Sequence, residues 1–227
     1  MEKVYIEVTN LDINTEYSDF GSFEHNGQLY FASGRNTSNK LYDWNEEPFL
    51  DLYQVDVEDN NGVKNLGRPG FIKAQDVNTN FHEASVAITN DGKTIYFTRD
   101  NVNKRNRLDY DKKGTTHLKI YKASLDNGNW TDIEELPFND DVFSTGHPAL
   151  SPDNKTLYFV SDRDDIDSFG QTDIYKVAIN DDGSYGEPEN LGANVNTEGR
   201  EMFPFVAKNN TLYFSAEFSI VEINIWK

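Results

Sequence analysis

The chain has 227 residues and carries 39 acidic against 21 basic side chains, a formal net charge of −18. Hydrophobic residues make up 37% and aromatic residues 13% of it, which is enough for a sizeable core and argues against global disorder. The negative charge disfavours binding to nucleic acid or anionic membranes, and the absence of cysteine excludes disulfides, thiol catalysis and cysteine-ligated zinc.

Two further absences narrow the class of protein. No apolar run approaches the roughly 18 residues of a membrane-spanning helix. The N-terminal stretch MEKVYIEVTNLD lacks the basic and apolar regions of a signal peptide. We therefore expect no membrane insertion, and either a cytoplasmic protein or a mature part of a longer one.

A short motif recurs four times along the chain. It consists of a polar turn and an alternating strand with a Tyr-Phe pair, at residues 30–31, 96–97, 158–159 and 213–214. Asn-Gly, Asp-Gly and Pro in the turns supply the backbone conformations of tight hairpins. Short strands precede the turns: FGSF, ASVAI, HPAL and MFPFV. The motif predicts four hairpins.

Further strands follow each hairpin. The third strand reads LDLYQVDV, LKIYKASL, TDIYKVAI and, at the end of the chain, INIWK. A fourth follows in three units, as VKNLG, DIEELPF and EPENLG, but not in the last unit. The N-terminal VTNLDINTE matches ENLGANVNTE, so the chain begins with the strand that its last unit lacks.

These units predict the fold class: all-β, a β-propeller of four-stranded antiparallel blades. We expect a single domain over residues 1–227, with blades at 14–67, 78–138, 143–192 and 196–227. A closing strand at 3–13 pairs with the last blade in this prediction, which hides two sheet edges. The alternative is an open array from a longer propeller. The aligned aromatic residues are expected to pack blade against blade.

The repeats resemble a known family. SPDNKTLYFVSDR followed by TDIYKV is similar to the envelope propeller repeats of the TolB and WD-repeat-like (PD) class. NTEYSDFGSF, NFHEASVAITNDGKTIYFTRDN, GHPALSPDNKTLYFVSD and NTEGREMFPFVAKNNTLYFS further resemble the propeller of OmpA-family proteins of Bacteroidota. The resemblance implies a propeller in the periplasm or associated with the outer membrane, serving as an interaction platform for other envelope proteins.

The sequence also departs from that family. It holds no helical repeats, no peptidoglycan-binding domain and no lipobox cysteine. Its last unit lacks the Gly-rich loop that the family places between second and third strands. Contact with peptidoglycan is therefore expected only through a domain outside this sequence.

Polar residues lead into the first strand of each unit. Because first strands line the channel of a propeller, we expect these residues to form a binding rim at one channel mouth. The alternative for the two histidines is a hydrogen bond to loop backbone within their own blades. The residues are Asp19, His82, Glu83, His147, Arg200 and Glu201.

Three loops are also candidates. The aromatic loop, residues 37–49, is expected either to contact a partner protein or to pack on its own blade edge, through Leu41, Tyr42, Trp44 and Phe49. The basic insertion 101–117 is predicted to be a solvated loop rather than a nucleic-acid patch. The aspartate-rich loop 162–173 lacks the ligand spacing of an EF-hand, so no metal site is predicted.

The sequence favours a non-catalytic protein. It shows no nucleophile elbow, HExxH motif, P-loop or dinucleotide fingerprint, and no cofactor is predicted. The runner-up is a carbohydrate-binding or glycoside-hydrolysing propeller. Its carboxylates would come from Asp19, Glu83 and Glu201, paired at about 5 Å or about 6.5–9.5 Å.

Overall fold

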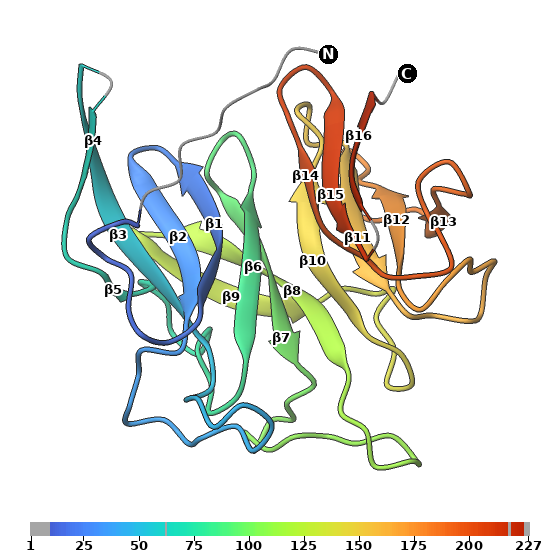
Figure 1. Ribbon diagram of the computed structural model, residues 1–227, viewed down its shortest axis with the longest axis horizontal. Helices are drawn as coiled ribbons and strands as arrows, with labels where there is room; N and C mark the ends of the chain where they lie inside the picture. The colour runs from blue at the N-terminus through green and yellow to red at the C-terminus, as the bar shows by residue number, and fades with distance from the viewer. Residues whose placement is uncertain (1–9, 62, 218, 225–227) are drawn as a thin grey trace.

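The computed structural model describes residues 10–61, 63–217 and 219–224 (Figure 1). These residues form sixteen strands in four antiparallel sheets and no helix, so nothing in the described part of the chain spans a bilayer as a helix. The predicted all-β class is confirmed.

The first two sheets follow the predicted blades. The first holds β1 (Asp19–His25), β2 (Gln28–Ser33), β3 (Asp51–Asn60) and β4 (Val63–Leu66), with β5 (Gly70–Phe71) paired to the beginning of β3. The second holds β6 (Glu83–Ile88), β7 (Thr94–Asp100), β8 (Leu118–Asp126) and β9 (Asn129–Glu135).

The last two sheets complete the repeat. The third holds β10 (Thr145–Leu150), β11 (Thr156–Ser161), β12 (Asp173–Ala178) and β13 (Glu189–Asn190). The fourth holds β14 (Glu201–Val206), β15 (Thr211–Ala216) and β16 (Ser219–Asn224).

The third strand of the last blade differs from its prediction. The sequence alignment placed it at INIWK, residues 223–227, of which 225–227 lie outside the described residues. The described strand β16 begins at Ser219 and pairs Val221 with Phe214. The last unit has no long insertion after its Tyr-Phe strand. The chain therefore reverses at once and starts its third strand several residues earlier than the motif suggested.

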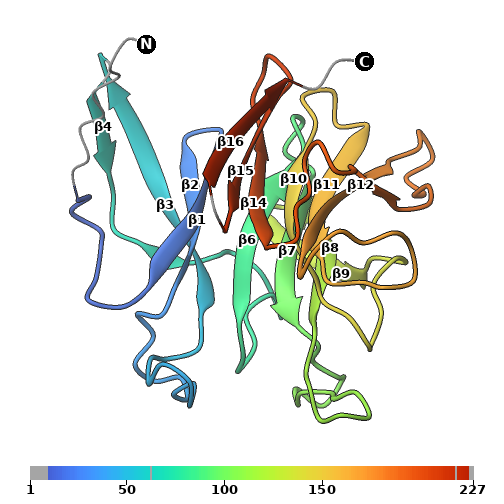
Figure 2. The same cartoon turned by 45° about the vertical axis from the view of Figure 1, so that its right-hand side comes forward.

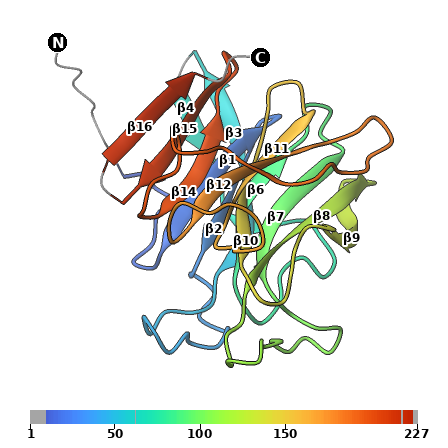
Figure 3. The ribbon, with the colours of Figure 1, turned by 90° about the vertical axis from the view of Figure 1, so that its right-hand side faces the viewer.

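The four sheets are arranged as propeller blades around a common axis (Figures 1 and 2). Successive first strands contact one another: β1 with β6, β6 with β10, and β10 with β14. Ring contact at 6.2 Å between Phe20 and Phe203 brings the first and last of these strands together. The view of Figure 3 places the β10–β13 and β14–β16 sheets side by side.

The structure describes only part of the predicted closing strand, residues 3–13. Residues 3–9 of it lie outside the described residues. Residues 10–13 enter a turn, and Ile13 packs beside Phe31 and Tyr53 of the first blade. The described residues form four blade sheets; the number of blades in the closed ring and the pairing of strand 3–13 with the last blade stay predictions.

The Tyr-Phe pairs pack blade against blade, as predicted, because neighbouring residues of a strand point to opposite faces. In the second blade, Tyr96 joins the core shared with the third blade, and Phe97 joins the core shared with the first. Tyr158 and Phe159 repeat this one blade further on. The last pair differs, since Phe214 is buried but Tyr213 is 37% exposed.

An asparagine before each later blade holds the third strand of the blade before it. The side-chain amide accepts from the backbone N–H and donates to the backbone C=O of one residue, at distances of 2.7–3.1 Å. In each pair the asparagine is the partner of the backbone N–H of a buried residue and adds a second donor to its C=O, which also accepts from the N–H of Ile72, Leu136 or Leu191 at 3.0–3.1 Å. The pairs are Asn78 with Leu52, Asn139 with Ile120, and Asn196 with Ile174.

Candidate functional site

A β-bulge interrupts every first strand at the same place. The register shifts between the pairs flanking Gly21, Ser85, His147 and Phe203, and all four residues have φ between 42° and 66°. Only glycine adopts this backbone region without strain, so three of the four positions hold an unfavourable conformation. Repetition in all blades shows that the bulge is a property of the fold rather than of one site.

The bulges line a central cavity of about 530 Å³. Its walls come from the first strands of all four blades and from the hairpins that follow them, which lie at the upper end of the molecule in Figure 1. Ser85, His147, Phe203 and Phe205 are among the lining residues. This volume is typical of small-ligand pockets, which run from about 300 to 1,000 Å³.

His147 is the one predicted rim residue that lines the cavity. Its Nδ1 accepts a hydrogen bond from the backbone N–H of Phe203 at 3.2 Å, and the two rings lie 4.2 Å apart. The histidine thus bonds to the neighbouring blade, not to its own. Burial lowers the pKa of His147 to about 4, so the ring is neutral and carries its proton on Nε2.

Two polar atoms of cavity residues find no hydrogen-bond partner among the described residues. One is the hydroxyl of Ser85, which is only 8% exposed. The other is Nε2 of His25, which is buried against the β6–β7 turn. There a Cβ on Gly92 would come within 2.9 Å of it. A buried polar atom without a partner costs on the order of 1–3 kcal/mol.

The three predicted rim carboxylates are each bound within a turn that recurs in three blades, and we call this turn the threonine corner. The backbone N–H and the hydroxyl of the threonine four residues earlier both donate to the carboxylate, at 2.6–3.0 Å. The pairs are Thr15 with Asp19, Thr79 with Glu83, and Thr197 with Glu201. Glu83 and Glu201 are completely buried and do not line the cavity.

Charged partners add to two of these corners. Asp19 forms an ion pair with Arg35 at 2.7 Å, and the guanidinium of Arg99 lies 3.5 Å from Glu83. Burial raises the pKa of Glu83 to about 8 in spite of Arg99 and Thr79. Arg200, the remaining predicted rim residue, has an exposed side chain, and its backbone pairs with Thr172. Of the six predicted residues, His147 alone lines the cavity, and the grouping of the other five at one channel mouth stays a prediction.

The aromatic loop lies at the opposite end of the blades from the cavity, at the bottom of Figure 1. His82, another predicted rim residue, contacts the aromatic loop. Its Nδ1 accepts from the N–H of Leu50, and its ring lies 4.7 Å from Tyr42 and 4.5 Å from Phe49. Phe49 is buried, whereas Leu41 is 59% and Trp44 83% exposed.

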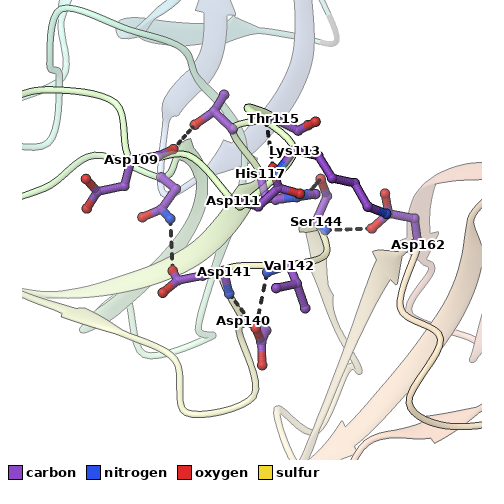
Figure 4. Close-up of polar contacts among 12 residues, drawn as sticks. Asp109, Asp111, Lys113, Thr115, His117, Asp140, Asp141, Val142, Ser144 and Asp162 are labelled. Atoms are coloured by element: carbon purple, nitrogen blue, oxygen red, sulfur yellow. Dashed lines mark hydrogen bonds and ion pairs between the residues drawn. The ribbon is translucent and has the colours of Figure 1, made fainter.

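The basic insertion 101–117 is ordered by its own polar contacts (Figure 4). His117 lies between Asp111, at 3.3 Å from Nε2, and Ser144, at 3.4 Å from Nδ1. This order of residue types resembles that of a relay to a nucleophile. Both contacts are long, however, and the backbone N–H of Ser144 is already donated to Asp162, which leaves it unable to stabilise an oxyanion.

The aspartates of the loop 162–173 accept hydrogen bonds from different residues of the chain. Asp162 accepts from Ser144, Asp165 forms two hydrogen bonds with Arg163, and Asp173 accepts from Phe169 and Gly170. Among the described residues, no group of three or more acidic or histidine side chains is placed to hold a metal ion.

Sequence reasoning missed the central cavity as a site. It placed the rim at the beginning of the first strands, whereas the cavity lies at their ends. The repeated left-handed residues leave no sequence signal, because Gly21, Ser85, His147 and Phe203 share neither size nor polarity. They share only their position in the first strand, a few residues before the hairpin turn.

No protein-family model matches the chain, and no curated protein matches it. A TolB-type protein of Agrobacterium tumefaciens is 17% identical over 84% of this chain and 50% of its own, with a TM-score of 0.45. A puromycin-hydrolyzing peptidase of Mycobacterium tuberculosis is 11% identical over 92% of this chain and 37% of its own, with a TM-score of 0.49.

A periplasmic gluconolactonase of Pseudomonas aeruginosa is more distant still. It is 13% identical over 87% of this chain and 67% of its own, with a TM-score of 0.33. The chain thus spans half or less of the TolB-type protein and of the peptidase. Likenesses at this level carry no argument about activity, substrate or partner.

Proposed function

We propose that the chain is a non-catalytic interaction scaffold that docks a protein of the bacterial envelope through its aromatic loop. The observation that carries the proposal is Trp44, whose side chain is 83% exposed on a loop with its own backbone hydrogen bonds and ring contacts. Tryptophan is enriched among the hot spots of protein interfaces, and its rigid ring loses little conformational entropy when it is buried.

Hydrogen bonds and ring contacts fix the loop. The N–H of Tyr42 donates to the carbonyl of Glu47 at 2.7 Å, and the N–H of Phe49 donates to that of Lys40 at 3.0 Å. The ring of Phe49 lies edge-on to Phe81 of the second blade at 5.5 Å. The loop therefore packs on both the first and the second blade through Phe49, and Leu41 and Trp44 are exposed on its outer side.

Charge defines the kind of partner. Asp43 and Glu46 flank Trp44 and are exposed, and the whole chain has a net charge of −18. A partner that combines an apolar pocket with a basic rim fits this surface and would be attracted to it at long range. An envelope location rests on the resemblance of the repeats to propellers of OmpA-family proteins.

The buried carboxylates support a non-catalytic role over glycoside hydrolysis. A glycosidase presents its two carboxyl groups to the substrate. Glu83 and Glu201 are instead enclosed and saturated by threonine donors, and Asp19 is bound to Arg35. Their arrangement suits three structural corners that begin the first strands.

The test is quantitative capture from an envelope extract, followed by an affinity measurement with each purified candidate. Wild type is compared with Trp44→Ala and Leu41→Ser, and with Phe169→Ala as the matched control. Phe169 is an exposed aromatic residue on another loop. We expect the first two variants to lose one partner by tenfold or more in affinity, and the control to keep it. Equal affinity in all four proteins would refute the assignment.

Hydrolytic activity is checked separately on a panel of glycosides. The proposal expects no turnover. Turnover that disappears in Glu83→Gln or Glu201→Gln, with folding retained, would refute the scaffold proposal and show that the protein is a glycosidase.

A further inference from the structure

The central cavity lies at the opposite end of the molecule from the aromatic loop and has no role in the proposed docking. It is enclosed by four chain segments that are up to about 180 residues apart in sequence, from the Gly21 bulge to the Phe203 bulge. Its wall contains six residues in left-handed backbone conformations, which are Gly21, Asn26, Ser85, His147, Asn154 and Phe203. The bulges belong to the fold of every blade, and they enclose the cavity because they meet at one end of the molecule.

The cavity offers hydrogen-bonding groups that the described protein does not use. The hydroxyl of Ser85 is buried without a partner, although it can both donate and accept. His147 engages only its Nδ1, with Phe203, so that Nε2–H is a donor at the cavity wall. A ligand hydroxyl can satisfy both kinds of group at once, because it donates and accepts through one atom.

Aromatic faces stand beside these polar groups. Phe203 is 41% and Phe205 54% exposed, and both line the cavity. Exposed rings of this size normally seek an apolar surface. Apolar walls with a few convergent polar groups are the usual composition of a pocket for a small organic molecule.

The charges around the cavity select against ionic ligands. Glu24 is paired with Lys64, and Lys208 has an exposed side chain on the β14–β15 hairpin. The interior histidine is neutral. Both of these charged lining residues are exposed, so an ionic group placed beside the buried Ser85 would lose its hydration, which is unfavourable. The ligand that fits is uncharged, polar on its edges and apolar on its faces.

We propose that the central cavity binds a small neutral saccharide, whose ring face packs on Phe203 and Phe205 and whose hydroxyls bond to Ser85 and His147. This site differs from a glycosidase site in position and in chemistry. It lies at the hairpin end of the first strands, and the carboxylates Glu83 and Glu201 do not line it. Binding without hydrolysis is therefore expected.

The experiment is a titration of the purified chain with maltose, cellobiose and chitobiose at millimolar concentrations, followed by calorimetry and by amide shifts in NMR spectra. Glucuronate and glucosamine serve as charged probes. We expect at least one neutral disaccharide to bind and to shift the amides of β6, β10 and β14, while the charged probes do not.

Variants separate the site from general effects. Phe205→Ala and Ser85→Ala are expected to weaken binding about tenfold, since each removes one contact of roughly 1.4 kcal/mol. Trp44→Ala, at the other end of the molecule, is the matched control and keeps full affinity. Thermal melting confirms that the variants fold. Absence of binding by all three disaccharides, or unchanged affinity in both cavity variants, overturns the proposal.

Discussion

Nδ1 of His147 accepts a hydrogen bond from the backbone N–H of Phe203, a residue 56 positions later in the chain. This bond joins the first strands of the third and fourth blades at their bulges, where both residues have positive φ. It also fixes the tautomer of a histidine at the wall of the central cavity. Packing between blades and chemistry of the cavity thus depend on the same side chain.

The burial of His147 makes stability depend on pH. Burial lowers the pKa of His147 to about 4, against about 6.5 in an unfolded chain. The unfolded state therefore binds more protons between these values, and stability is lost as the pH falls from about 6.5 to about 4. His82 has the same lowered pKa, of about 4, and acts in the same direction. The loss is on the order of 2–3 kcal/mol for each histidine.

The variant His147→Asn checks this assignment. Its amide oxygen accepts from Phe203 in place of Nδ1, and asparagine tolerates the left-handed backbone. Urea unfolding at pH 7 is expected to change little, while part of the loss between pH 6.5 and pH 4 disappears. A variant whose stability falls as steeply as that of the wild type would show that His147 is not the titrating group.

Glu83 is expected to produce a second pH dependence of opposite sign. Burial raises its pKa to about 8, above the usual value near 4.5. Its contribution to stability is therefore complete below about pH 4.5 and is lost as the pH rises through 8. Glu83→Gln cannot ionise, so its melting temperature should rise relative to that of wild type between pH 5 and pH 9. The exposed Glu187→Gln serves as control and should show no such trend.

Asn196→Ala is expected to destabilise the protein by about 1–3 kcal/mol, because it leaves the buried backbone N–H of Ile174 without its hydrogen-bond partner, while the C=O of Ile174 keeps the N–H of Leu191 at 3.1 Å. The measurement is urea unfolding at neutral pH. Asn65→Ala removes an exposed amide on β4 and should cost less than about 0.5 kcal/mol. Similar costs for the two changes would mean that the amide pair contributes little.

Gly170→Ala tests the packing of the aspartate-rich loop. A Cβ at this position would lie 2.3 Å from the carbonyl oxygen of Thr197 and 2.5 Å from that of Gly199. Backbone atoms must move to admit it, so we expect a loss of about 3 kcal/mol or more and a lower melting temperature. Gly70→Ala meets no atom within 4 Å and should be neutral. Equal melting temperatures would show that the loop adjusts freely.

The repeated residues of the chain made the fold predictable. Tyr96 and Phe97 mark the two packing faces of a blade. Successive side chains of a strand point to opposite faces, so each of the two residues packs against a different neighbouring blade. The Asn26-Gly27 pair has positive φ at both residues and closes the first hairpin as its sequence indicates. Local rules of this kind act within a few residues, so they can be read from the sequence.

The candidate sites could be predicted only in part. Trp44 was recognised from its loop context and proves to be exposed, but the burial of Phe49 depends on Phe81 and His82, which arrive from the next blade. Glu83 and Glu201 looked available for chemistry. The threonine four residues before each carboxylate encloses it, and this corner forms only when the chain turns into the first strand.

The sequence by itself determined the blades, their turns and the aromatic contacts between them, because these follow from strand alternation and turn chemistry over short distances. Only the tertiary structure decided where a ligand can enter. The cavity requires four bulges from four blades to meet, and it requires Ser85 and His147 to keep unused polar atoms at its wall. Neither condition is local, so neither leaves a pattern that one stretch of sequence can show.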